Sequence, residues 1–218
     1  VRHIDQDYET QSLAGPLKFQ TVSALPYKAQ NRRLFLLHLD LLHESADQGS
    51  VDGYSLLALF QLEPAPKLLD LVDIRADRFN GFWEEAPLFD LTPATQAVMI
   101  YHSHHNSNQG YLIQRLLFVP HNRLEEILQV STLSQQARCL TFKSTTKFRL
   151  QPDPARAYPK VAATVTLTMQ PDPPDCQPRQ RGYTRVFRET WRWQPAKQHY
   201  EDAAGNLKAL YKLYDKWY

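Results

Sequence analysis

Apolar and polar residues alternate along most of the chain with a period of two, the spacing of a β-strand that buries one face. The clearest run is 33–43, in which alternate residues from Phe35 to Leu41 are all apolar, while His38 and Asp40 lie on the opposite side. The leucine content of this run also fits a short helix. Comparable runs predict further strands at residues 17–25, 54–62, 67–74, 97–105, 111–119, 139–150, 161–169 and 183–193.

These runs are joined by short polar connections, and this pattern predicts a mainly β protein with an antiparallel sheet system. The clearest hairpin combines runs 139–150 and 161–169, which are rich in Thr, Val and Phe and keep their prolines in the connection between them. A sandwich, an open barrel and a propeller-like meander all fit this arrangement.

Two stretches have helical spacing instead. Residues 122–129 predict a short helix, with Asn122 as the N-cap and Glu125 in the capping-box position three residues later. Residues 206–218 predict an amphipathic helix, because their apolar side chains recur every three or four positions opposite lysines. We expect this C-terminal helix to pack on its own sheet; the alternative is that it docks on a partner protein.

Length and composition fit an ordinary globular protein. The 218 residues are 43% hydrophobic and 22% charged, which is sufficient for a core that needs no metal or disulfide support. We predict a single β-rich domain over 1–218, with 1–31 forming an irregular N-terminal wrap apart from its one strand. Charged or polar residues interrupt every apolar run well before the roughly 18–20 residues that a membrane-spanning helix requires, so no membrane span is expected.

The compartment has to be inferred from the N-terminal residues and the cysteines. The chain starts at Val1, and it lacks a basic segment followed by an apolar stretch, which favours a mature exported form, periplasmic or extracellular, without its signal peptide. Cys139 and Cys176 allow one disulfide near the end of the 139–150 run, or two thiols.

Most short enzyme motifs are absent. The sequence has no glycine-rich nucleotide loop, no G-x-S-x-G and no H-E-x-x-H motif, and its 7 glycines against 15 prolines suit strands with proline-containing connections. The net charge of +2, from 25 basic and 23 acidic residues, argues against a dedicated nucleic-acid binder. Composition therefore requires no cofactor.

A histidine cluster at the end of run 97–105 is the strongest local signal for metal chemistry. His102 and His104 lie two positions apart, so on a strand they project from the same face and could chelate zinc. A third ligand and an open coordination position would make this a metal-dependent hydrolase. The alternative is that these histidines end a strand and bind loop carbonyls.

The most basic stretch lies in run 183–193. Arg188 and Arg192 share one face of the predicted strand, and Arg185 precedes them on the chain. Such a cationic face fits a glycan or another anionic ligand, held by bidentate arginine contacts. Trp83, in an aromatic loop with Phe79 and Phe82, is a second candidate for ligand contact.

No catalytic set of residues converges in the sequence. The leading hypothesis is therefore a non-enzymatic, extracytoplasmic β domain that binds a protein or a cell-envelope ligand. The zinc hydrolase centred on His102 and His104 is the alternative.

Overall fold

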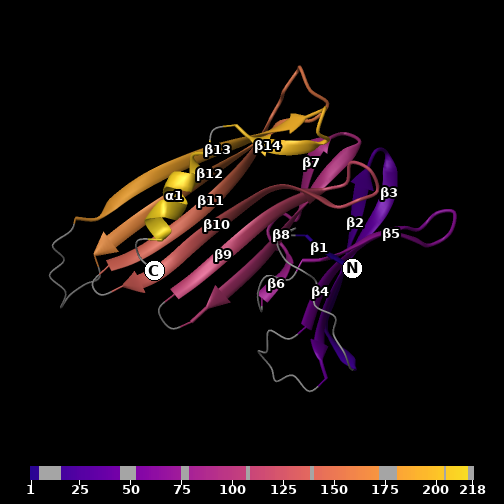
Figure 1. Ribbon diagram of the computed structural model, residues 1–218, viewed down its shortest axis with the longest axis horizontal. Helices are drawn as coiled ribbons and strands as arrows, with labels where there is room; N and C mark the ends of the chain where they lie inside the picture. Colours follow the sequence, from indigo (N-terminus) through magenta and orange to yellow (C-terminus); the bar gives the residue numbers. More distant parts are fainter. Residues whose placement is uncertain are drawn as a thin grey trace. The chain divides into compact units, whose positions relative to one another are not determined.

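The computed structural model describes residues 1–4, 16–44, 53–74, 79–106, 109–137, 140–171, 181–203 and 205–215 (Figure 1). The strands in chain order are β1 Arg2–His3, β2 Leu17–Ala29, β3 Arg32–His43, β4 Gly53–Gln61, β5 Lys67–Asp73, β6 Phe79–Phe82, β7 Leu88–Thr92, β8 Thr95–His105, β9 Gln109–Phe118, β10 Glu125–Ala137, β11 Leu140–Gln151, β12 Lys160–Pro171, β13 Tyr183–Gln194 and β14 His199–Asp202. One helix, α1, spans Leu207–Tyr214 among the described residues. The mainly β prediction is confirmed.

The strands form two sheets. One has the order β1-β5-β4-β3-β2, and the other the order β14-β13-β12-β11-β10-β9-β8-β6, with β7 paired to β8. Strand β1 pairs with β5 in parallel, whereas β2–β3, β3–β4 and the neighbours from β10 to β14 pair antiparallel. The predicted antiparallel sheet system is therefore confirmed.

The chain divides into two compact units. Unit 1 comprises Val1–His102 and Arg115–Ile127, and unit 2 comprises Ser103–Gln114 and Leu128–Tyr218. The boundary crosses β8, β9 and β10. The prediction of one domain over the whole chain stays a prediction.

Unit 1 has its core on the inner face of the five-stranded sheet. In β3 the even-numbered residues from Leu34 to Leu42 are buried, and in β4 Leu57 and Leu59 lie on the same side. These side chains pack with Val98 and Ile100 of β8, and with Leu117, Val119 and Leu124. The alternation of burial along β3 and β4 follows from the strand period of two.

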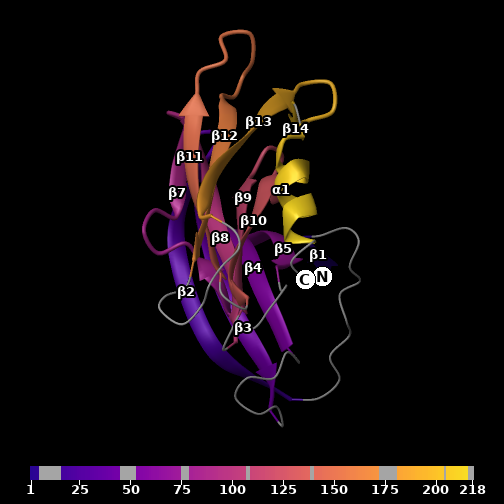
Figure 2. The ribbon, with the colours of Figure 1, turned by 90° about the vertical axis from the view of Figure 1, so that its left-hand side faces the viewer.

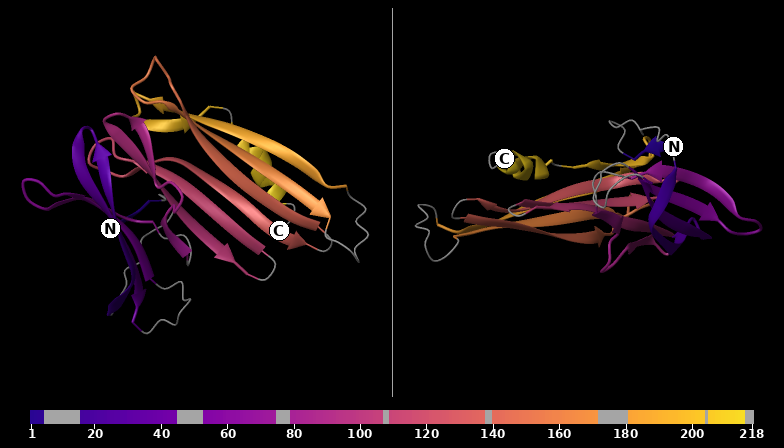
Figure 3. Two further views of the ribbon diagram at one scale, coloured as in Figure 1. Left: turned by 180° about the vertical axis from the view of Figure 1, so that it is seen from behind. Right: turned by 90° about the horizontal axis from the view of Figure 1, so that it is seen from below.

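Unit 2 has its core between the β11–β13 strands and α1, which lies along one face of these strands (Figures 1 and 3). Tyr214 shares a 2.7 Å hydrogen bond with Ser144 of β11, and the Leu207 N–H donates to the buried Glu189 carboxylate at 3.3 Å. Leu210 is fully buried. The C-terminal helix therefore packs on its own sheet, as expected; residues 216–218 of the predicted range lie outside the described part.

The helix predicted over 122–129 is wrong. Asn122 has φ +57° rather than an N-cap conformation, and Glu125 begins strand β10. Neighbouring strand β9 explains the difference, because Arg115 of β9 reaches Glu126 at 2.9 Å, and both Ile127 and Leu128 are buried. Burial on both sides of a sheet outweighs a local capping signal worth about 1 kcal/mol.

Two other expectations can be compared only in part. Within the described ranges, no helix combines the length and the apolar character needed to cross a bilayer. Cys139 and Cys176 both lie outside the described residues, so the predicted alternatives of a disulfide or two thiols stay open.

Leu210→Ala tests the docking of α1. This side chain is fully buried, so its truncation is expected to lower the free energy of unfolding by about 2–5 kcal/mol. Urea denaturation followed by tryptophan fluorescence measures this change. Lys212→Ala, on the exposed side of the same helix, should change the free energy by less than about 0.5 kcal/mol. Equal effects of the two substitutions would contradict the docked helix.

Candidate functional site

The exposed side of β11–β13 in unit 2 carries a basic face. Its cations come from three neighbouring strands and are Lys143, Lys147, Arg149, Lys160, Arg188 and Arg192. The residues between them on this face are mostly threonines: Thr141, Thr145, Thr164, Thr166, Thr168, Thr184 and Thr190. Among the described residues of these three strands, the only carboxylate is Glu189, which points to the opposite, buried side.

Strand register places these side chains in rows. Thr164 of β12 pairs with Lys147 of β11 and with Arg188 of β13, so the three form one row across the sheet. Adjacent strands lie about 4.8 Å apart, which puts the backbones of Lys147 and Arg188 about 10 Å apart. Lys143 and Gln151 at the two ends of the face are about 27 Å apart along the strand. The face therefore presents its cations over an extended area.

No ion pair within the described part engages the six cations. At one edge Glu201 of β14 pairs in register with Arg192, but its carboxylate binds Lys197 and His199 at the end of β14. These contacts hold the pKa of Glu201 below its usual value, with the Lys197 hydrogen bond as the largest cause. Glu201 therefore contacts Lys197 and His199 rather than Arg192.

The structure places the predicted ligand residues in three settings. Arg188 and Arg192 lie together on the basic face, whereas Arg185 lies on the other side of β13 with its guanidinium 5.1 Å from the Tyr183 ring centroid. Trp83 belongs to unit 1, where it is half-buried and its ring lies edge-on to Tyr101 at 5.9 Å.

The sequence analysis did not identify the lysines of β11 and β12 as candidate ligand residues. The spacing of Lys143, Lys147 and Arg149 by even intervals marked them as one face of the predicted hairpin. Their association with Arg188 depended on β13 pairing with β12, and this pairing is not readable from one sequence.

The two histidines proposed as zinc ligands have different surroundings. His102 is fully buried, and neither of its ring nitrogens has a hydrogen-bond partner in the described part of the chain. His104 is half-buried and stacks on Tyr111, with ring centroids 5.8 Å apart. Among the described residues, no group of three His, Cys, Asp or Glu side chains is arranged to hold a metal ion. The zinc hypothesis stays a prediction.

A buried histidine–serine contact in unit 1 resembles a nucleophile and its base, but its hydrogen bonds differ from those of an activated serine. His38 Nε2 lies 2.8 Å from Ser55 Oγ and 2.9 Å from Asn80 Oδ1, and the Ser55 hydroxyl also donates to Asn80 Oδ1. An activated serine would instead give its proton to the histidine, whose other nitrogen would be held by a third group. Among the described residues His38 Nδ1 has no such partner, and Ser55 is fully buried.

Burial disfavours the protonated form of both histidines of this region. It lowers the pKa of His38, against smaller opposing effects from Asn80 and Asp40. Burial also lowers the pKa of His102 to about 3, and the charge of Arg115 adds to this shift. Protonation of either ring in the folded protein would place a charge in the core of unit 1.

Acidification is therefore expected to destabilise the protein. Below the ordinary histidine pKa of 6.5 the unfolded chain takes up a proton at residue 102, whereas the folded chain does so only near pH 3. The unfolded state binds more protons in this window, so the free energy of unfolding falls with falling pH, by up to about 1.4 kcal/mol per pH unit for this group. Urea denaturation at a series of pH values measures the slope.

His102→Leu should reduce this slope, because the leucine cannot be protonated. His105→Leu is the matched control, since His105 is exposed on the same strand. A slope that is unchanged in His102→Leu would contradict the neutral buried histidine.

Comparison with known proteins adds no identification. The basic face combines exposure with a defined chemistry, whereas the buried histidines lack access for a substrate. No protein-family model, curated protein or solved structure matches the chain.

Proposed function

We propose that this protein is a non-enzymatic binding module, acting outside the cytoplasm, whose basic face recognises an anionic glycan of the cell envelope. The observation that carries this proposal is the set of six cations on one exposed face without a carboxylate among the described residues of β11–β13. Arg188 and Arg192 of the sequence hypothesis are part of this face.

The distribution of charge favours a polymer over a small anion. A single phosphate or carboxylate is usually held by two or three donors that converge in a pocket. Here the cations follow the sheet over about 27 Å, and threonine hydroxyls between them can bind sugar hydroxyls. A chain with acidic groups at intervals matches this surface better than one compact anion does.

The same face argues for a glycan rather than a nucleic acid. Proteins that bind single strands stack bases on exposed aromatic rings. The aromatic residues of β13 all point to the opposite side of the sheet from Arg188; they are Tyr183, Phe187, Trp191 and Trp193. An acidic glycan in the envelope further implies an exported protein, the location that we propose.

Removing the central pair of cations tests the proposal. Lys147→Gln/Arg188→Gln is expected to weaken binding to polygalacturonate, an acidic glycan probe, by about tenfold, because the variant removes two exposed ion pairs that contribute up to about 1 kcal/mol each. Calorimetric titration measures the dissociation constant. Added salt should weaken binding of the unaltered protein, because ions screen exposed charges.

Lys208→Gln/Lys212→Gln is the matched control. It makes the same change in net charge on the exposed side of α1 in the same unit, and should leave affinity unchanged. Loss of affinity in both double variants would indicate binding by net charge alone and would contradict a defined face. Tighter binding to duplex DNA than to the glycan would identify the wrong polymer.

The zinc hydrolase requires its own measurement. Elemental analysis of protein purified without chelator is expected to show no near-stoichiometric transition metal, because the described residues offer His102 and His104 no third ligand. One equivalent of zinc that is lost in both His102→Ala and His104→Ala would overturn the non-enzymatic proposal.

A further inference from the structure

The outer side of the five-stranded sheet is rich in apolar residues, and several of them are exposed in the part of the chain that the structure describes. We call the apolar face the apolar residues on the outward side of β2–β5, which are Leu17, Phe19, Val22, Ala24, Pro26, Phe35, Leu37, Leu39, Leu41, Tyr54, Leu56, Ala58, Phe60, Leu68 and Leu71. The outward side also carries His43 and the buried Asp73, and Ala58 is buried. Phe19 is 67% exposed and Val22 is 56% exposed. Leu37, Leu39 and Leu41 in the middle of the sheet are half-buried, while the inner side of β3 is buried.

Strand β3 shows that this exposure is not a by-product of core formation. Its outward residues from Phe35 to Leu41 are all apolar, while its inward residues include His38 and Asp40. A soluble sheet normally turns its more apolar face inward and a polar face to water. Large exposed apolar patches mark interaction sites. This arrangement points to a ligand on the outer side.

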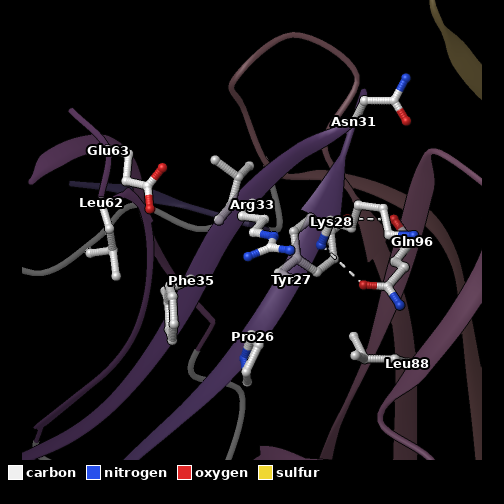
Figure 4. Close-up of a pocket in the computed structure, with 11 residues that line it drawn as sticks. Pro26, Tyr27, Lys28, Asn31, Arg33, Phe35, Leu62, Glu63, Leu88 and Gln96 are labelled. Carbon is white, nitrogen blue, oxygen red and sulfur yellow. Dashed lines mark hydrogen bonds between the residues drawn. The ribbon is translucent and has the colours of Figure 1, made fainter. Parts of the chain in front are cut away.

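A groove at one end of the apolar face adds positive charge. It has a volume of about 840 Å³, and Pro26, Lys28, Arg33 and Phe35 of its lining belong to the outer side of β2 and β3 (Figure 4). That volume is within the range of small-molecule sites. A concave groove favours a small molecule as the ligand, because a protein partner with a flat surface would not fill it.

Two cations mark the end of the groove. Lys28 and Arg33 are exposed and pair directly across β2 and β3, next to the Pro26–Phe35 pair (Figure 4). Figure 2 shows the two strands that carry these pairs. Lys28 Nζ donates to the Pro93 carbonyl at 2.8 Å, while Arg33 makes no hydrogen bond or ion pair among the described residues. Glu63 also lines the groove, beside Leu62, so the groove has two cations and one carboxylate.

We propose that the apolar face and its groove hold one fatty-acid-like amphiphile, with the acyl chain on the leucines and the anionic headgroup at Arg33 and Lys28. The length fits, because Phe35 and Leu41 are about 20 Å apart along β3. One leaflet of a bilayer's hydrocarbon core, which an acyl chain spans, is about 15 Å thick. Charge at one end and apolar residues along the rest match the two parts of such a molecule. This proposal is independent of the basic face.

Equilibrium dialysis with palmitate below its micellar concentration tests the site. Val22→Glu places a carboxylate on the apolar face and is expected to weaken palmitate binding at least about tenfold. Phe19→Ser, at the most exposed apolar residue of the face, should act in the same direction if Val22→Glu fails to fold. Arg33→Gln should weaken palmitate binding about fivefold or more but leave binding of uncharged palmitoyl glycerol unchanged.

Val186→Glu is the matched control, because Val186 is an exposed valine, 44% exposed, on β13 of unit 2. It should leave palmitate binding unchanged, as should Lys147→Gln/Arg188→Gln. Equal losses in Val22→Glu and Val186→Glu would place the fatty acid on the basic face and overturn the proposal. Absence of palmitate binding would also overturn the proposal. This holds whether light scattering then shows a second copy on the apolar face or the protein adsorbs only to anionic vesicles.

Discussion

Successive side chains of a strand point to opposite sides of a sheet. In each unit of this protein one face of the sheet therefore packs in the core, and the other face is directed outward. In unit 1 the inner face of β3 and β4 packs on β8 and β9 residues. In unit 2, α1 covers one face of β11–β13 through Leu207, Leu210 and Tyr214. Which residues lie on the outward face of each sheet is therefore set by which residues pack in the core.

The two outward faces differ sharply in composition. On β11–β13 the outward residues are lysine, arginine and threonine, the ordinary solution for a sheet that faces water, except that acidic residues are missing. On β2–β5 the outward residues are leucine, phenylalanine and proline, which do not suit water. A surface of single charge sign and a surface of apolar character both favour binding over a purely structural role. Their ligands are proposed from different chemistry and can be tested separately.

The core of unit 1 contains a group of buried polar side chains. His38, Ser55 and Asn80 satisfy one another, whereas His102 has no partner for either ring nitrogen among the described residues. Such a group lowers stability and is tolerated where the surrounding packing outweighs its cost. The lowered pKa of His102 is the electrostatic consequence, and it makes the stability of unit 1 depend on acid pH.

The sequence by itself determined nine of the strands, since eight of the nine predicted runs match strands within a few residues and the ninth, 17–25, lies within β2. Strands β1, β6, β7, β10 and β14 were not predicted. Period-two patterning is a local property, and it can be read from one chain. The helix predicted from a capping pattern at 122–129 was wrong, because the ion pair of Arg115 with Glu126 and the burial of Ile127 outweigh that pattern. Only the tertiary structure decided which face of β3 is inward and that β11, β12 and β13 join their cations, because strand order and register arise from long-range pairing.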